Sequence, residues 1–340
     1  MASPANPVPQ TVAVLGAGSW GTALAIQFAR AGHPTRLWSR SATDVAAMRA
    51  ERQNRRYLPD AKFPDGIEVH DALAGAVAGA VAIILAVPSH ALRGLLQQLK
   101  PLLARDARLA WATKGFELET GKLPHQVAYD VLGDKYPVAV LSGPTFAREV
   151  GMGLPTAMTI ASPDEDFAAQ LARNLHASNF RAYTSADIVG VEVGGAVKNV
   201  LAVGAGLCDG LGFGANTRIA LITRGLSEVM RLGVALGAQP ETFMGLAGLG
   251  DLVLTCTDDQ SRNRRFGLAL AAGKNVEVAL REIGQVVEGY TAARAVHAVA
   301  RRENVDMPIV TGIYRILYEN ESARDVVKDL MTRPIRPEVE

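Results

Sequence analysis

Lys198 is the residue whose surroundings point most directly to chemistry. It lies in an almost wholly apolar stretch, residues 194–202. On a helix, spacings of three and four residues place on one face Gly195, Lys198, Asn199, Ala202 and Gly206. That face is small and polar with one cation, like the wall of a pocket. Because burial lowers the pKa of a lysine, Lys198 is a candidate general acid/base. The alternative is a lysine whose ammonium reaches the surface along the helix.

Lys114 and Asp251 are two further candidates for the same chemistry. Lys114 follows the predicted strand 109–113, and ligands of open α/β sheets bind over the carboxyl ends of the strands. Asp251 follows Gly248 and Gly250, a glycine pair that we expect to be flexible and to bring the carboxylate within reach of Lys198. For Lys114 the alternative is the ordinary chemistry of a loop.

Two polar segments could bind anions. Residues 142–147 follow an apolar run and open a short helix, whose backbone N–H groups could hold an anion or a carbonyl oxygen. Residues 261–265 combine three cations with two hydrogen-bonding side chains at a helix start, namely Ser261, Arg262, Asn263, Arg264 and Arg265. This combination suits a phosphate dianion. The alternatives are an ordinary loop for the first segment and a solvated charge run for the second.

Residues 16–21 have the pattern GxGxxG between a predicted strand, 11–15, and a predicted helix. Gly16 would allow a tight turn, Gly18 the close approach of a pyrophosphate, and Gly21 close packing of helix on strand. The N-terminus of that helix would present N–H groups and its positive dipole end to the phosphates. In this context the pattern predicts a dinucleotide site. A glycine-rich turn that binds nothing is the alternative.

Arg40 bears on the choice of cofactor. The second predicted strand, 35–39, is followed by Arg40 and lacks the acid that usually binds the ribose 2′-OH of NAD(H). Arg40 is placed to meet a 2′-phosphate through a charge-assisted hydrogen bond, with a solvated surface cation as the alternative. We therefore expect NADP(H) to be preferred, with NAD(H) as the second cofactor.

The predicted secondary structure that positions these residues differs between the two halves of the chain. Predicted strands in the first half are residues 11–15, 35–39, 81–87, 109–113, 138–142, 156–161 and 181–184. Apolar runs alternating with helices are typical of a parallel sheet covered on both faces. Predicted helices in the second half are residues 187–207, 218–237, 263–272, 291–303 and 308–319. The predicted units are a cofactor-binding α/β domain (1–190), an all-helical substrate and catalytic domain (191–335) and a flexible tail (336–340).

Composition excludes several classes of protein. The chain has 340 residues, enough for two domains, with 49% hydrophobic residues and a net charge of +1 that argues against a nucleic-acid binder. Two cysteines and six histidines without ligand spacing argue against a disulfide scaffold and a metal site. The N-terminus does not have the pattern of a signal peptide. The longest apolar run, 73–87, is shorter than the roughly 20 residues of a membrane helix, so we expect a cytoplasmic protein without membrane insertion.

Several motifs in a fixed order resemble one known family. They are GAGSWGTALA (16–25), LPD (58–60), FPD (63–65), VPSH (87–90), WATKG (111–115), SGPTFA (142–147), GGAVKN (194–199), GFGAN (212–216), ALITRG (220–225), GLGDLVLTCT (248–257), SRNRRFG (261–267) and VVEGY (286–290). Together they resemble the bacterial NAD(P)-dependent glycerol-3-phosphate dehydrogenases, from about residue 11 to about residue 325. The pair GGAVKN and SRNRRFG is the most specific part of this resemblance.

The resemblance implies a Rossmann-type domain, a helical domain of the 6-phosphogluconate-dehydrogenase type, and a homodimer. The implied reaction is the reversible reduction of dihydroxyacetone phosphate to sn-glycerol 3-phosphate for phospholipid synthesis. Lys198 would donate and accept the proton, in a cationic pocket with Asp251 as the acid beside it. Implied substrate contacts are Lys114, Gly143, Thr145, Lys198, Asp251, Ser261, Arg262 and Asn263. Implied cofactor contacts are Gly16, Gly18, Ser19, Trp20, Gly21, Arg40, Tyr57, Lys114, Ala147, Arg262, Val286 and Glu288; the positions of Arg40 and Tyr57 vary in the family.

Other functions stay open at the level of the residues. No tyrosine is followed four residues later by lysine, which argues against a short-chain dehydrogenase. A sister dehydrogenase acting on another hydroxy acid is the second hypothesis, which the cations of residues 262–265 disfavour. A non-catalytic NADP-binding sensor is the third, and it would leave Lys198 and Asp251 without a role.

Overall fold

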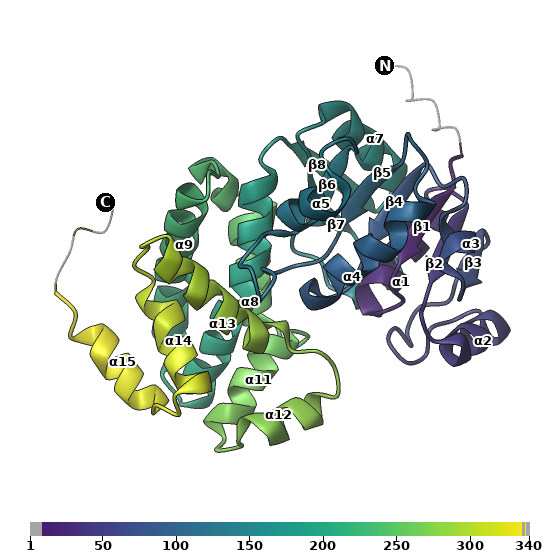
Figure 1. Ribbon diagram of the computed structural model, residues 1–340. Helices are drawn as coiled ribbons and strands as arrows, with labels where there is room; N and C mark the ends of the chain where they lie inside the picture. Colours follow the sequence, from purple (N-terminus) through teal and green to yellow (C-terminus); the bar gives the residue numbers. More distant parts are fainter. Residues whose placement is uncertain (1–8, 335–336, 338–340) are drawn as a thin grey trace.

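The computed structural model describes residues 9–334 and residue 337, and it contains an α/β part followed by a helical part (Figure 1). This confirms the expected fold class. The predicted tail, 336–340, lies outside the described residues except for residue 337. The predicted division at residue 190 stays a prediction.

Eight strands form one sheet in the order β3-β2-β1-β4-β5-β6-β7-β8. Their bounds are β1 (Val12–Leu15), β2 (Thr35–Trp38), β3 (Ile67–His70), β4 (Ala82–Leu85), β5 (Arg108–Trp111), β6 (Val138–Ser142), β7 (Thr156–Ala161) and β8 (Phe180–Ser185). Seven of these were expected. The sequence patterns missed β3, an edge strand in which buried and partly exposed side chains alternate, so that no continuous apolar run marks it.

The expected parallel sheet reverses its direction once, at the last two strands. β7 pairs antiparallel with β6, and β8 then runs parallel to β7. The connection between β6 and β7 contains only the six-residue helix α6 (Ala147–Met152).

Helices cover both faces of the sheet. Their bounds, besides α6, are α1 (Ser19–Arg30), α2 (Ala42–Glu51), α3 (Leu73–Val77), α4 (Ser89–Leu99), the 3-10 helix Lys100–Leu102, α5 (Pro124–Leu132) and α7 (Glu165–Leu175). In β1, Val12 and Val14 pack in a cluster with α1 and α7, whereas Ala13 and Leu15 pack in a second cluster with α4 and α5. Burial on both faces explains why the central strands read as continuous apolar runs.

The helical part is built around α8 (Ile188–Gly210), which lies between the sheet and the remaining helices (Figure 1). The other bounds are α9 (Gly214–Ala235), the 3-10 helix η2 (Pro240–Met244), the π-helical turn η3 (Leu246–Gly250), α10 (Asp251–Thr257), α11 (Arg262–Ala271), α12 (Val276–Ile283), α13 (Glu288–Arg302), α14 (Pro308–Tyr318) and α15 (Ala323–Met331). The five predicted helices correspond to α8, α9, α11, α13 and α14. The short helices α10, α12 and α15 were not predicted.

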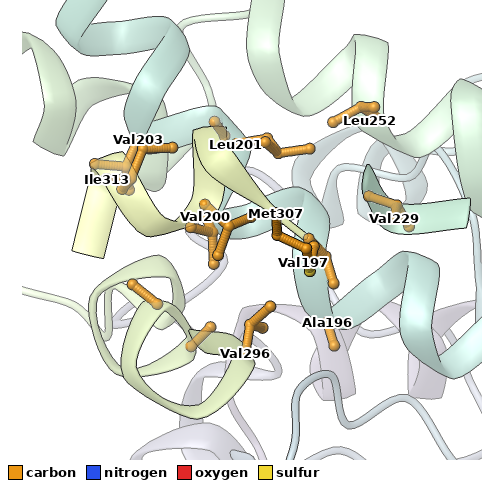
Figure 2. Close-up of a cluster of buried hydrophobic side chains, with 14 of the residues drawn as sticks. Ala196, Val197, Val200, Leu201, Val203, Val229, Leu252, Val296, Met307 and Ile313 are labelled. Atoms are coloured by element: carbon orange, nitrogen blue, oxygen red, sulfur yellow. The ribbon is translucent and has the colours of Figure 1, made fainter. Parts of the chain in front are cut away.

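Apolar side chains of α8 form the centre of the helical core. Val197, Val200 and Leu201 pack against side chains of the neighbouring helices, including Val296 of α13 and Ile313 of α14 (Figure 2). Within the described residues α8 is long and apolar enough to cross a membrane, but 94% of its most apolar window is buried inside the protein. Its hydropathy is that of a core helix.

Two glycines bring α8 and α11 into backbone contact. A Cβ at Gly206 would lie 2.0 Å from the carbonyl oxygen of Arg264, and one at Gly267 would lie 2.1 Å from that of Val203. Any larger residue would push the helices apart. This close crossing fixes the N-terminus of α11, with Ser261 to Asn263, beside Lys198 and Asn199 of α8. Gly206 thus packs helix on helix, and it does not line a pocket as the face of small residues suggested.

Candidate active site

Lys198, Asp251 and Lys114 form a buried ion-pair triad. Lys198 Nζ lies 2.5 Å from Asp251 Oδ1, and Lys114 Nζ lies 2.6 Å from Asp251 Oδ2. Lys198 also donates to the hydroxyl of Thr255 at 3.0 Å. Lys198 is 8% exposed and Asp251 is 1% exposed, so the ammonium of Lys198 does not reach the surface along the helix.

The three residues of the triad come from separate parts of the fold. Lys114 follows the carboxyl end of β5, Lys198 lies in α8, and Asp251 is the first residue of α10. Asp251 comes directly after the π-helical turn, a rare structure that is frequent at functional sites. The expectation of a flexible glycine pair was wrong for Gly248, because a Cβ there would lie 2.2 Å from the carbonyl oxygen of Phe243. The turn is packed, and it holds Asp251 in place.

The protonation of the triad follows from its burial and charges. Burial lowers the pKa of Lys198 to about 8, and the positive charge of Lys114 acts in the same direction, while Asp251 opposes the shift. Burial by itself would raise the pKa of Asp251, but the two ammoniums hold that pKa below its usual value. Lys198 can therefore exchange a proton near neutral pH beside an acid that stays ionised.

The triad lines a cleft of about 480 Å³ between the two parts of the chain. Predicted site residues that line this cleft are Ser19, Trp20, Tyr57, Lys114, Thr145, Ala147, Lys198, Asp251, Ser261, Arg262, Asn263 and Glu288. The walls do not include Gly16, Gly18, Gly21, Arg40, Gly143 and Val286. The cleft thus brings together residues from distant parts of the sequence, as a ligand-binding site at a domain interface does.

The charge of the cleft is more mixed than the sequence suggested. Besides Asp251, its lining includes the acids Asp60, Asp259 and Glu288. Asp60 pairs with Arg148 across the cleft wall at 2.9 Å. The pocket is therefore cationic only locally, where Lys114, Lys198 and the start of α11 converge.

The start of α11 has the form of an anion site, but only two of its three predicted arginines contribute to it. Ser261 caps the helix by accepting from the backbone N–H of Arg264, and Arg262 and Arg265 line the cleft. The Arg264 side chain turns away and pairs with Asp209 at 2.7 Å and with Asp259. Two of the three arginines therefore face the cleft, because the third stabilises the contact between α11 and α8.

A chain of side-chain amides fixes the cleft wall beside the triad. Asn263 donates to Asn199 at 2.8 Å, Asn199 donates to Glu288 at 2.9 Å, and the N–H of Gly289 donates to Asn263 at 2.8 Å. Each amide is thereby held in one orientation. Helical spacing already places Asn199 on the face of Lys198, although without a role. Thr255 was not predicted; it lies one turn after Asp251, so the same spacing could have indicated it.

The glycine-rich turn fits the pyrophosphate of a dinucleotide. Gly16 has a φ of +116°, and a Cβ at Gly21 would lie 1.9 Å from the carbonyl oxygen of Gly16. A Cβ at Gly18 would meet nothing within 4 Å, so the backbone there faces open space. No side chain caps the N-terminus of α1 within the described residues. The free N–H groups of that helix end therefore point to a place where an anion can bind.

For three predicted cofactor contacts the structure gives little support. Arg40 is exposed just beyond the end of β2. Tyr57 lines the cleft with Arg56 over its ring, and its loop is tied to the glycine-rich turn by Asn54, which donates to the carbonyl of Ala17. Val286 is 50% exposed two residues before Glu288. Nothing in their contacts selects the cofactor.

Known proteins resemble the chain over almost its whole length. Sequence models of the N-terminus and the C-terminus of NAD-dependent glycerol-3-phosphate dehydrogenase match residues 11–168 and 187–328. The glycerol-3-phosphate dehydrogenase (NAD(P)+) of Pseudoalteromonas translucida (strain TAC 125) is 56% identical over 328 residues, 96% of this chain and 98% of that protein. The enzyme of the same name from Vibrio cholerae serotype O1 (strain M66-2) is 55% identical over 96% of this chain and 95% of that protein.

A solved structure agrees with these sequence matches. The crystal structure of glycerol-3-phosphate dehydrogenase from Coxiella burnetii superposes with a TM-score of 0.93 at 46% identity, covering 96% of this chain and 100% of that one. Both the sequence and the fold are thus shared over the cleft and its surroundings. The chain belongs to the NAD-dependent glycerol-3-phosphate dehydrogenase family.

Proposed function

We propose that the chain reversibly reduces dihydroxyacetone phosphate to sn-glycerol 3-phosphate with a nicotinamide cofactor, for the synthesis of glycerophospholipids. The observation that carries this proposal is the triad of Lys198, Asp251 and Lys114 in the lining of the cleft. A glycine-rich turn suited to a dinucleotide and a helix N-terminus suited to a phosphate complete it. The names of the close relatives support the same reaction.

The residues of the cleft have complementary tasks in this reaction. A bound nicotinamide cofactor would supply the hydride to the C2 carbonyl. Lys198 would give its proton to the carbonyl oxygen, and the ammonium of Lys114 would stabilise the negative charge that develops there. Asp251 would hold both ammoniums in place and keep Lys198 protonated. In the reverse direction Lys198 would take the proton back from the alcohol.

We also propose which residues contact the substrate and which contact the cofactor. The substrate phosphate would bind to Ser261, Arg262 and Asn263 at the start of α11. Gly143 and Thr145 are the further substrate contacts that we propose. Cofactor contacts would be Gly16, Gly18, Ser19, Trp20, Gly21, Arg40, Tyr57, Lys114, Ala147, Arg262, Val286 and Glu288. We assign cofactor binding to residues 1–190 and substrate binding and catalysis to residues 191–335.

A spectrophotometric assay tests the function. Purified protein mixed with NADPH and dihydroxyacetone phosphate should oxidise NADPH in proportion to protein concentration, and NAD(P)+ with sn-glycerol 3-phosphate should run the reverse reaction. Cofactor binding without turnover would contradict the proposal and favour a sensor. Turnover only with an unphosphorylated hydroxy acid or its keto acid would favour a sister dehydrogenase.

Arg262→Ala should weaken catalysis far more for a phosphorylated substrate than for an unphosphorylated one. A charge-assisted contact to the phosphate contributes enough free energy that kcat/KM for dihydroxyacetone phosphate should fall by about 10- to 100-fold. Dihydroxyacetone, which does not carry the phosphate, is the matched substrate. Equal losses for both substrates would show that Arg262 does not bind the phosphate.

Arg40→Asp should raise the KM for NADPH and spare that for NADH, because an acid at this position repels the 2′-phosphate. We expect an increase of about tenfold or more, the scale of one charge-assisted contact. Arg105→Asp, a change of the same charge at an exposed loop, is the control. An unchanged ratio of the two KM values would remove the argument for NADP(H) preference.

We further propose that the protein is a cytoplasmic homodimer that neither inserts into membranes nor binds nucleic acid. The family resemblance suggests the dimer, and the buried position of α8 accords with a core helix. Light scattering coupled to size exclusion would give the mass of the particle in solution, and a monomeric mass would contradict the dimer.

A further inference from the structure

Glu192 is a buried acid of α8 that does not line the cleft and has no role in the chemistry above. It is 3% exposed, and its carboxylate accepts three hydrogen bonds. Trp111 Nε1 donates to Oε1 at 2.8 Å, the backbone N–H of His125 donates to the same oxygen at 3.0 Å, and His125 Nδ1 lies 2.5 Å from Oε2.

The three hydrogen bonds join separate elements of the α/β part to α8. Trp111 is the last residue of β5 and is fully buried, and His125 lies in the first turn of α5. Burying a carboxylate costs free energy that an apolar side chain of similar size would not cost. In return, the carboxylate fixes the directions of three donors, so its most specific contribution is to the alignment of these elements.

That alignment leads directly to Lys114. Lys114 lies three residues after Trp111, and Gly195 lies one helical turn after Glu192 on the same face of α8. A Cβ at Gly195 would lie 3.5 Å from Lys114 Cγ and 3.6 Å from its Cδ, so the stem of Lys114 runs against α8 at this point. The same face of the helix thus binds Trp111 and, one turn later, guides the lysine toward Asp251.

We propose that Glu192 is a positioning residue for the reaction: by holding Trp111 and His125, it sets the end of β5 so that the Lys114 ammonium reaches Asp251 beside Lys198. This proposal rests on the proposed function for its kinetic consequences. Glu192 does not touch the reacting atoms. Its effect passes through the backbone from Trp111 to Lys114, which Thr113 steadies by donating to the carbonyl of Val87 at 2.7 Å.

Glu192→Ala should lower kcat for dihydroxyacetone phosphate by about 10- to 100-fold, the loss expected when a catalytic group is misplaced by about 1 Å. Glu192→Gln keeps an oxygen that can accept from Trp111 and His125, and it should restore kcat to within about threefold of the wild type. The matched control is Glu228→Ala, which removes another buried acid that accepts from the backbone N–H groups of Ile309 and Val310, away from the cleft.

The pH profile separates positioning from a loss of structure. The charged groups that face Lys198 are Asp251 and Lys114, with the neutral hydroxyl of Thr255 beside them. If Lys114 moves away, Lys198 loses a repulsive neighbour, and the alkaline limit of the reduction should shift to higher pH in Glu192→Ala. Glu228→Ala should leave that limit unchanged. A wild-type kcat and alkaline limit in folded Glu192→Ala would overturn the proposal, as would equal changes in both alanine variants.

Two further measurements keep the test decisive. If Glu192→Ala does not fold, Trp111→Phe removes one donor and keeps an aromatic, though smaller, side chain; a shifted alkaline limit then supports the proposal, and an unchanged limit contradicts it. A crystal structure of Glu192→Ala, or of Trp111→Phe in its place, should show Lys114 Nζ beyond hydrogen-bond distance of Asp251, whatever the substrate is. An intact contact would overturn the positioning role, whereas an inactive wild type would contradict only the proposed function.

Discussion

Lys198→Ala should lower kcat for the reduction of dihydroxyacetone phosphate by about 10³-fold while the protein stays folded and binds NADPH. The substitution removes the ammonium that would protonate the C2 oxygen. Water can enter the space that is left, but it is a weaker acid and is not held in position. Removing a positioned general acid typically costs 10²- to 10⁴-fold, and the ammonium of Lys114 would continue to stabilise the developing charge.

The stability of this variant should change little in comparison. Burial disfavours the charged form of Lys198 and lowers its pKa to about 8, so removing this ammonium also removes a desolvation cost to the folded protein. Asp251 keeps Lys114 as an ion-pair partner after the substitution. Thermal unfolding and NADPH titration would check folding and cofactor binding. They separate a catalytic defect from a structural one.

Two comparisons sharpen the assignment. Lys198→Met retains most of the side-chain volume, so it should be as inactive as the alanine variant if the ammonium matters and not the packing. A small primary amine such as ethylamine should partly restore activity to Lys198→Ala alone, because the cavity can admit it. Near-normal turnover in either variant without added amine would exclude Lys198 as the proton donor.

The sequence allowed several parts of this site to be predicted because their signals are local. A cation in an apolar helix marked Lys198, and a glycine pattern between a strand and a helix marked residues 16–21. Strand ends are also local signals, and β6 and β7 have the predicted bounds. In each case the residue type and its immediate neighbours carry the information.

Features that depend on direction or on distant contacts could not be predicted. Sequence shows that Arg264 is charged, but not that it turns toward Asp209, which lies on another helix. Likewise Gly248 looks flexible until its contact with Phe243 is known, and nothing local distinguishes an antiparallel β7 from a parallel one. The link from Glu192 to Trp111 spans 81 positions of the chain, so only the tertiary fold discloses it.

Asp251→Asn should have the second large effect, since it removes the negative charge that pairs with both lysines. Asp251 raises the pKa of Lys198, and Lys114 lowers it. Without the carboxylate only the repulsion and the burial remain, so the pKa of Lys198 should fall below its present value of about 8. At neutral pH less of the acid form would be present, and we expect kcat to fall by about 10²-fold.

The pH dependence of the reduction should shift in a definite direction in Asp251→Asn. In the wild type the rate of reduction should fall as pH rises through about 8, where Lys198 loses its proton. In Asp251→Asn the same fall should occur at lower pH, so that part of the activity returns on acidification. This direction is opposite to the shift expected for Glu192→Ala, because one variant removes the attractive neighbour of Lys198 and the other displaces the repulsive one.

Stability should change as well, and an exposed acid provides the control. Leaving the buried Lys198 ammonium without its carboxylate partner costs about 3–5 kcal/mol in the free energy of unfolding, a deficit that should shrink at high pH as Lys198 loses its proton. Asp130 is the counterpart at the surface, since it pairs with Arg93 at 3.1 Å and with Lys122 at 2.5 Å. Asp130→Asn should therefore cost much less stability than Asp251→Asn and leave the pH profile in place. If the alkaline limit of Asp251→Asn coincided with that of the wild type, Asp251 would not be the group that sets the proton affinity of Lys198.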